Sequence, residues 1–211
     1  MPKKEIFLNK EIKQVHDELQ AKLTEDKKQK SDFEKHLKDI KSGDTRQEMV
    51  YSQSPYRFAL PNGSDFDFKR YIKSLKVVRR KIKILDVGAG KGHFLAELKS
   101  ELGNKIHTTA LDIYEHEELN EKYKKGQIDE LVYESAELFL PTQTYDIIVS
   151  NLGGLKYSLM PDLVIRKLAH SLRKDGILLI YPALKIPKEI DKDKRFKNIK
   201  LQSAIAIKRV E

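Results

Sequence analysis

Three glycines at alternate positions stand between a short apolar segment and an amphipathic one, in the stretch ILDVGAGKGHF at residues 84–94. A strand that runs into such glycines and then opens a helix makes a tight turn, in which the backbone can approach a ligand. We therefore expect Gly88, Gly90 and Gly92 to line a binding site. The first turn of the following helix would favour negative groups there.

The spacing of the glycines argues against two nucleotide-binding loops. No Lys-Ser or Lys-Thr pair ends the stretch, so it is not a P-loop, and the third glycine follows the second by two residues rather than the three of the dinucleotide fingerprint. Asp86 precedes the first glycine by two residues. Its carboxylate would repel a pyrophosphate but attract the ammonium of a zwitterionic amino acid. These residues favour a ligand like S-adenosylmethionine.

The segments around the glycines alternate between strand and helix patterns, which predicts an α/β fold. We expect a doubly wound, mainly parallel sheet with helices on both faces. Residues 198–210 alternate loosely and predict one or two closing strands. The expected strands are 82–87, 105–113, 130–134, 145–150 and 177–181, and the expected helices are 93–102, 115–125 and 162–173.

Four ordered segments resemble a known family. The sequence DVGAGKG at 86–92 resembles motif I of the class I S-adenosylmethionine-dependent methyltransferases, and ALDI at 110–113 resembles the end of the family's second strand. The stretches ESAELFLPTQTYDIIVSN at 134–151 and HSLRKDGILLI at 170–180 resemble two later family segments. The resemblance spans residues 82–184. It implies a Rossmann-like methyltransferase fold with S-adenosyl-L-methionine as the cofactor.

The resemblance also implies roles for individual side chains. Asp112 falls where the family binds the two ribose hydroxyls, and Ile113 falls where the family packs an apolar side chain on adenine. Ser135 stands where the family usually has an aspartate that accepts a hydrogen bond from the adenine amino group, and a hydroxyl accepts that bond more weakly. The expected cofactor-binding residues are Asp86, Gly88, Gly90, Gly92, Asp112, Ile113, Ser135, Ala136 and Asn151.

The sequence leaves the catalytic residues open. In the resembling family the methyl acceptor approaches the end of the fourth strand, which here is the stretch NLGGLKY at 151–157. Asn151, Tyr157 and His93 are the candidate catalytic residues, and Lys156 is a further acid–base candidate. Cysteine is absent, so methylation through a covalent cysteine adduct is excluded. No cluster of metal-ligating residues is evident, and we expect no metal.

Residues 1–48 are predicted to form a helical extension, and residues 49–211 are predicted to form the S-adenosylmethionine-binding methyltransferase domain. A narrow apolar stripe follows one helical face of the extension. This stripe could lie on the main domain, pair with another chain in an oligomer, or cover a ligand. Its members are Leu8, Ile12, Val15, Leu19 and Leu23, and the aromatic segment that follows the extension contains Tyr51, Tyr56, Arg57 and Phe58.

The charge distribution leaves the methyl acceptor open. The net charge is +9, with eight basic residues and no acidic residue in 69–83, and nine basic and four acidic residues in 185–211. These two stretches could form one surface for RNA or DNA. We favour a small-molecule acceptor over nucleic acid, because the aromatic segment 51–58 could wall a pocket and no nucleic-acid motif is present. The alternative function is a non-catalytic module of the same fold that binds S-adenosylmethionine or nucleic acid.

Cellular location is an expectation from composition. The longest apolar run, at 177–181, cannot span a bilayer, and the first residues lack the apolar core of a secretory signal. The chain has no cysteine and therefore no disulfide. We expect a cytoplasmic protein that does not bind the membrane.

Overall fold

One seven-stranded sheet organises the chain. The computed structural model describes residues 10–25, 30–35, 38, 66–75, 80–151, 154–201 and 204–211. Within them the strand order is β3-β2-β1-β4-β5-β7-β6, with β1 to β5 parallel and β7 antiparallel to both of its neighbours. The strands are β1 (Ile82–Val87), β2 (Ile106–Asp112), β3 (Glu130–Tyr133), β4 (Tyr145–Asn151), β5 (Leu172–Tyr181), β6 (Phe196–Lys200) and β7 (Ile205–Arg209).

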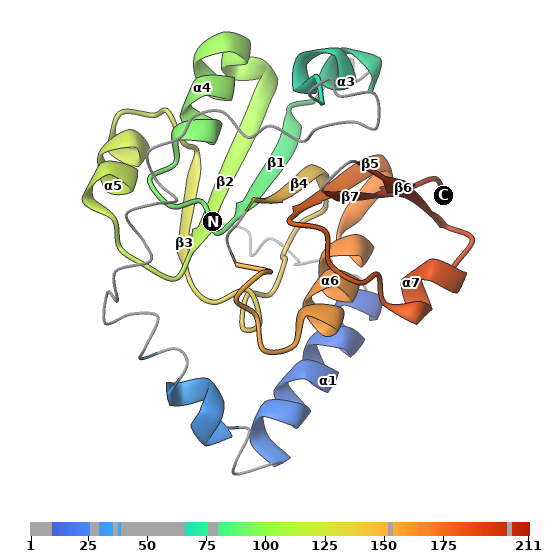
Figure 1. The fold of residues 1–211 in the computed structure, drawn as a ribbon. Helices are drawn as coiled ribbons and strands as arrows, with labels where there is room; N and C mark the ends of the chain where they lie inside the picture. The colour runs from blue at the N-terminus through green and yellow to red at the C-terminus, as the bar shows by residue number, and fades with distance from the viewer. Residues whose placement is uncertain are drawn as a thin grey trace, which may run out of the picture.

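Helices cover both faces of this sheet (Figure 1). Neighbouring strand residues point to opposite faces, so Ile84 joins a cluster with α3, α4 and α5, whereas Leu85 joins a cluster with α1, α6 and α7. This arrangement confirms the predicted doubly wound, mainly parallel fold. The helices are α1 (Lys10–Glu25), α3 (Phe68–Ser74), α4 (His93–Leu102), α5 (Glu117–Lys124), α6 (Pro161–His170) and α7 (Lys188–Lys192), and a short 3-10 turn spans Gly103–Lys105.

The helix α1 packs against the hydrophobic core on one face of the sheet of this same chain. Its apolar stripe is buried, with Leu19 0% exposed, and it joins the same core cluster as α6. Figure 1 shows α1 lying alongside α6, and the carboxylate of Glu18 pairs with Arg166 of α6 at 3.1 Å. The first of the three alternatives for the stripe is therefore observed. Pairing with another chain through this face would require α1 to leave α6. Leu8, the boundary at 48/49 and the segment 51–58 lie outside the described residues.

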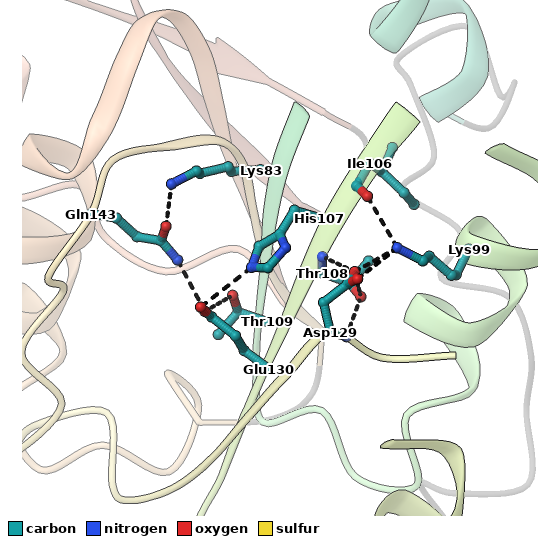
Figure 2. A network of polar contacts seen from close by, with 9 residues as sticks. All are labelled: Lys83, Lys99, Ile106, His107, Thr108, Thr109, Asp129, Glu130 and Gln143. Carbon is teal, nitrogen blue, oxygen red and sulfur yellow. Dashed lines mark hydrogen bonds and ion pairs between the residues drawn. The ribbon is translucent and has the colours of Figure 1, made fainter. Parts of the chain in front are cut away.

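Two partly exposed carboxylates, Asp129 and Glu130, hold the amino ends of β2 and β3 (Figure 2). Asp129 accepts hydrogen bonds from Lys99 at 2.7 Å and from the backbone N–H of Thr108 at 2.9 Å, which joins α4, β2 and the start of β3. A second carboxylate, Glu130, holds β2 and β3 together in the same region. Its partners are Thr109, Gln143 and His107, and Gln143 also accepts from Lys83.

Part of the basic run at 69–83 is used inside the molecule. Both terminal nitrogens of Arg80 donate to the carboxylate of Asp146 at 2.6 Å, and Asp146 is almost fully buried. The backbone N–H of Lys83 donates to the same carboxylate at 2.8 Å. Arg80, one of the eight basic residues of this run, therefore anchors the start of β1 to β4.

The end of α6 was also predicted too late. The helix ends at His170 instead of residue 173, because Leu172 already pairs with Tyr145 as the first residue of β5. The guanidinium of Arg209 donates to the carbonyls of His170 and Leu172, at 3.3 and 2.8 Å, and so satisfies carbonyls at this helix end. The closing segment forms the hairpin β6–β7, which confirms the predicted strands, and α7 was not predicted.

Candidate functional site

The glycine loop lies at the carboxyl edge of the sheet. It connects β1 to α4, and β1 is the strand from which the chain builds the sheet outward in both directions, to β2 and β3 on one side and to β4 and β5 on the other. Ligands of open α/β sheets bind in the crevice outside the carboxyl ends of the strands at such a switch point. The loop therefore stands where this fold places its ligands.

The backbone amides of the loop point into the protein. Gly88 and Ala89 donate to the carbonyl of Leu111 on β2, at 2.8 and 3.1 Å, and Gly90 donates to the carboxylate of Asp112 at 2.6 Å. Gly92 donates to Ala89 within the loop, at 2.9 Å. All four amides are therefore already paired within the protein. An anion-binding cradle needs free amides, so the geometry disfavours a pyrophosphate ligand.

Two of the glycines are required for different reasons. Gly90 adopts a φ of 55°, in the left-handed region that other residues enter at a cost. Gly92 adopts a φ of 70°, and a Cβ there would lie 2.6 Å from Leu119 and 2.7 Å from Ile128. Gly92 is therefore needed for close packing of α4 against the α5 side of the molecule, which is a structural role that the sequence did not reveal.

Asp112 is the polar centre of the site. It is 5% exposed and accepts the N–H of Gly90 with one oxygen and the N–H of Tyr114, at 2.9 Å, with the other. Burial raises the pKa of Asp112, while these two backbone hydrogen bonds and the nearby His116 act in the opposite direction. A carboxylate offers about four acceptor positions, and the backbone N–H groups of Gly90, Tyr114 and Ile113 act on this one, so acceptor capacity for a ligand donor remains. A ribose hydroxyl fits this arrangement.

The residues expected around adenine lie beside Asp112. The backbone N–H of Glu134 donates to the carbonyl of Asp112 at 2.9 Å, which brings the segment after β3 next to the end of β2. Ser135 and Ala136 are buried, and Ile113 is half-buried. The hydroxyl of Ser135 accepts the N–H of Leu138 at 3.3 Å and so caps the turn that follows. Ser135 therefore already has a structural role, and one acceptor position of its hydroxyl remains.

The residues expected around the methionine part end two neighbouring strands. Asp86 is fully buried on β1, in register with Ala110 of β2 and Val149 of β4. Asn151 is the last residue of β4 and is half-buried opposite Tyr181 of β5. Asp86 therefore lies two residues before the glycine loop, and Asn151 ends the neighbouring strand.

The loop after β4 approaches the glycine loop more closely than the sequence indicated. A Cβ on Gly154 would lie 3.0 Å from a methyl carbon of Val87 and 3.6 Å from the backbone nitrogen of Gly88. The N–H of Gly154 is directed at the carbonyl of Val87, at 3.4 Å. The Gly-Gly pair in the stretch NLGGLKY was the available sequence signal for this contact.

The candidate catalytic side chains lie on different elements. His93 begins α4, is 44% exposed, and its ring lies 3.6 Å from Glu118 of α5. Burial is the main cause that lowers the pKa of His93, and the positive charge of Lys122 lowers this pKa further. Tyr157 lies on the loop after β4, with the ammonium of Lys156 5.3 Å from its ring centre. His93 is therefore directed to α5, whereas Lys156 and Tyr157 follow Asn151 on the loop after β4.

Glu137 and Lys167 are two buried charged residues that the sequence analysis did not single out. Glu137 joins the segment after β3 to the loop after β4. Glu137 accepts the N–H of Leu159 with its carboxylate at 3.1 Å, and its carbonyl accepts from the ammonium of Lys167 at 2.8 Å. Burial lowers the pKa of Lys167 to about 8, and the carboxylates of Glu137 and Glu134 oppose that change. A lysine inside a helix of mixed polarity carries no sequence signal for burial.

The described residues form neither a metal-binding cluster nor a membrane-spanning helix. No group of three or more histidine, aspartate or glutamate side chains in those ranges could hold a metal ion. None of the helices that the structure describes has the length and apolar character needed to cross a membrane.

Three solved structures illustrate what this chain is similar to. One is the 1,6-didemethyltoxoflavin-N1-methyltransferase of Burkholderia thailandensis with bound 1,6-didemethyltoxoflavin and S-adenosylhomocysteine (15% identity, TM-score 0.47, 63% of this chain and 72% of that chain). Another is an rRNA methylase of Streptococcus thermophilus (17% identity, TM-score 0.47, covering 67% of this chain and 93% of that chain). A third is the O-methyltransferase of a trans-AT PKS multienzyme of Brevibacillus brevis in complex with S-adenosyl-L-homocysteine (19% identity, TM-score 0.41). The match covers 53% of this chain and 39% of that chain, so this chain spans about two fifths of its length.

A family model settles the classification. No curated protein has a sequence that matches this chain. The model described as "Methyltransferase domain" matches residues 79–210, which covers every strand of the sheet and the glycine loop. The chain therefore belongs to this methyltransferase family, as a class I enzyme whose methyl donor is S-adenosylmethionine.

Proposed function

We propose that this methyltransferase holds its cofactor across the carboxyl ends of β1, β2 and β4 and acts on a small-molecule acceptor at the loop after β4. The observation that carries the cofactor position is the Asp112 carboxylate, which ends β2 beside the glycine loop, holds the Gly90 N–H at 2.6 Å and keeps acceptor capacity for a ligand donor. When bound, S-adenosylmethionine supplies a methyl group activated by its sulfonium. The contribution of the chain is therefore mainly positioning.

Each expected side chain has a proposed task. Asp112 accepts hydrogen bonds from the two ribose hydroxyls, Ile113 packs on adenine, and Ser135 accepts from the adenine amino group beside Ala136. Asp86 attracts the ammonium of the methionine part, and Asn151 contacts that part from β4. Of the glycines, Gly88 and Gly90 shape the loop, whereas Gly92 serves mainly the packing of α4.

A small-molecule acceptor is supported by the surfaces near the loop after β4. Tyr157 and Leu159 are 38% and 45% exposed, which gives this loop an apolar surface. Arg80 and Lys83, which we expected to contribute to a polyanion surface, are bound to Asp146 and Gln143 instead. We propose Tyr157, Lys156 and His93 as the groups to test for acid–base roles. We also propose the cytoplasm as the compartment, because a chain without cysteine needs no oxidising environment.

Two measurements test this function. Calorimetry should show binding of S-adenosylhomocysteine and no binding of NAD, because the amides that would hold a pyrophosphate are directed at Leu111 and Asp112. Transfer of a radiolabelled methyl group from S-adenosylmethionine should then be measured into fractionated metabolites, RNA and protein. Label in the metabolite fraction supports a small-molecule acceptor. Label confined to RNA or protein would overturn it, and binding of NAD would overturn the cofactor assignment.

A further inference from the structure

A cavity of about 560 Å³ lies where α1, the helical residues 30–35 and the start of α6 meet. Pockets for small organic ligands have volumes of roughly 300–1,000 Å³, so this cavity has the size of a ligand site. It adjoins the loop after β4 and is not one of the surfaces assigned above to the cofactor. The lining residues are Lys22, Asp32, Leu159, Met160, Pro161, Asp162 and Leu163.

One wall of the cavity is apolar and includes an exposed leucine. Among the described residues three large apolar side chains are strongly exposed. Two of them, Tyr157 and Leu159, lie two positions apart in the sequence, and Leu159 lines the cavity. Leu159 is 45% exposed, whereas the neighbouring Met160 packs against the core. Clustered exposed apolar side chains mark surfaces that contact a ligand or partner. This wall is therefore suited to the apolar body of a small molecule.

The other wall carries more negative than positive charge. The ammonium of Lys22 lies 3.4 Å from the carboxylate of Glu18 on the same helix, so its charge is already partly matched. Asp32 and Asp162 take part in no ion pair with another of the described residues. This local excess of carboxylates contrasts with the net charge of +9 of the whole chain. Asp162 lies in the first turn of α6, whose dipole matches part of its charge, so Asp32 contributes most to the attraction of a cation here.

The apolar wall is held in place from the cofactor side. The carboxylate of Glu137 accepts the backbone N–H of Leu159 at 3.1 Å, and Glu137 follows Ser135 by two residues. The hydroxyl of Ser158 accepts the N–H of Met160 at 3.1 Å. The cavity wall is thus joined through one buried side chain to the segment proposed to contact adenine. A molecule in the cavity would be held at a fixed position relative to the cofactor.

We propose that this cavity recognises a small molecule with an apolar body and a cationic amine, and that this molecule belongs to the acceptor class of the enzyme. The inference rests on the proposed small-molecule function and adds the chemical class. Leu159 and its apolar neighbours contact the body of the molecule, and Asp32 and Asp162 attract its ammonium group.

The test compares two probes of matched shape and opposite charge, 2-phenylethylamine and 3-phenylpropionate. Binding of each to the full chain is measured by ligand-observed NMR titration, with and without saturating S-adenosylhomocysteine. We expect the amine to bind and the acid not to bind. Asp32→Asn and Asp162→Asn should each weaken amine binding by about two- to fivefold, the range expected for partly exposed charge pairs. Glu117→Gln, which removes an exposed carboxylate on α5, is the matched control and should have no effect.

The outcomes separate the two proposals. Equal or tighter binding of the acid, unchanged amine binding in both aspartate variants, or no amine binding at millimolar concentration would each overturn the cavity assignment. Filling the cavity through Leu159→Trp should also abolish amine binding, whereas Tyr123→Trp, at an equally exposed position on α5, should not. S-Adenosylhomocysteine binding is measured by calorimetry on the same samples. Its absence would refute the cofactor site, and that result does not depend on either probe.

Discussion

The carboxylate of Asp112 accepts the backbone N–H of Gly90 at 2.6 Å, although the two residues lie 22 positions apart in the sequence. This bond joins the end of β2 to the glycine loop after β1. The carboxylate proposed to hold the ribose therefore also fixes the loop against which the rest of the cofactor lies. The shape of the loop and its recognition of the cofactor are coupled through one side chain.

Asp112→Ala should weaken binding of S-adenosylhomocysteine strongly. The substitution removes the acceptors for two ribose hydroxyls, and each hydrogen bond to a charged group contributes about 1.5–3 kcal/mol. We expect a loss of at least roughly tenfold per bond, measured by calorimetry. Asp112→Asn should have an intermediate effect, because its single oxygen still accepts.

Asp129→Asn is the matched control for that experiment. Asp129 is a partly buried carboxylate of the same sheet, but it lies at the amino end of the strands and pairs with Lys99. This variant should lower stability in urea and leave the affinity for S-adenosylhomocysteine unchanged. Unchanged affinity in Asp112→Ala would remove Asp112 from the cofactor site.

The strands, most of the helices and the glycine loop follow from patterns that a sequence displays directly. Apolar residues at 82–87 and 145–150 fill β1 and β4, and the glycines between β1 and α4 mark the carboxyl edge. Periodicity reports which face of an element is buried, and glycine reports where the backbone turns. These local signals are sufficient for the fold class and for the glycine loop at which we propose that the cofactor binds.

Other features depend on partners that are distant in sequence. Nothing near Gly90 shows that its N–H is directed at Asp112, and nothing near Arg80 identifies Asp146 as its partner. Lys167 is fully buried because Glu137 offers a carbonyl at 2.8 Å, a contact between residues 30 positions apart. Such pairings are fixed by the assembled sheet and not by local composition.

Ser135→Asp should tighten binding of S-adenosylhomocysteine. The hydroxyl of Ser135 already accepts the N–H of Leu138 at 3.3 Å, and a carboxylate can keep that bond while offering a charged acceptor to the adenine amino group. Calorimetry checks the affinity, and Ser135→Ala should weaken it. If the aspartate variant folds normally and binds no more tightly than the parent, the proposed placement of adenine at residues 135–136 is wrong.

Arg80→Glu should destabilise the fold and not merely alter the surface. The guanidinium forms two hydrogen bonds of 2.6 Å to Asp146, whose side chain is 2% exposed, so a glutamate would place two carboxylates together. Breaking a buried pair costs about 3–5 kcal/mol, and we expect roughly 2–4 kcal/mol because Arg80 is itself 37% exposed. Urea unfolding measures this cost, with Arg70→Glu on the exposed face of α3 as the control. Equal stability of the two variants would contradict the assignment.

Leu19→Ala should destabilise the whole domain, because α1 contributes to the same core as α6. Leu19 is 0% exposed, and truncation of a buried leucine costs about 2–5 kcal/mol. Gln14→Ala, at an exposed position of the same helix, is the control. A single cooperative urea transition with a lower midpoint is expected for Leu19→Ala. Loss of α1 alone, seen as a separate early transition, would show instead that the helix is an independent cover.

The stability of the fold should rise with pH above about 8 because of Lys167. Burial lowers its pKa in the folded chain to about 8, whereas an unfolded lysine keeps a pKa of about 10.4. Between these values the unfolded chain binds a proton that the folded chain has released, so raising the pH favours folding. The gain accumulates over this window and is on the order of 3 kcal/mol. Urea unfolding at a series of pH values should show this rise in the parent and a flatter curve in Lys167→Met. Lys13→Met, at an exposed position of α1, should retain the parent's slope, and parallel curves for the parent and Lys167→Met would contradict the burial of a titrating ammonium.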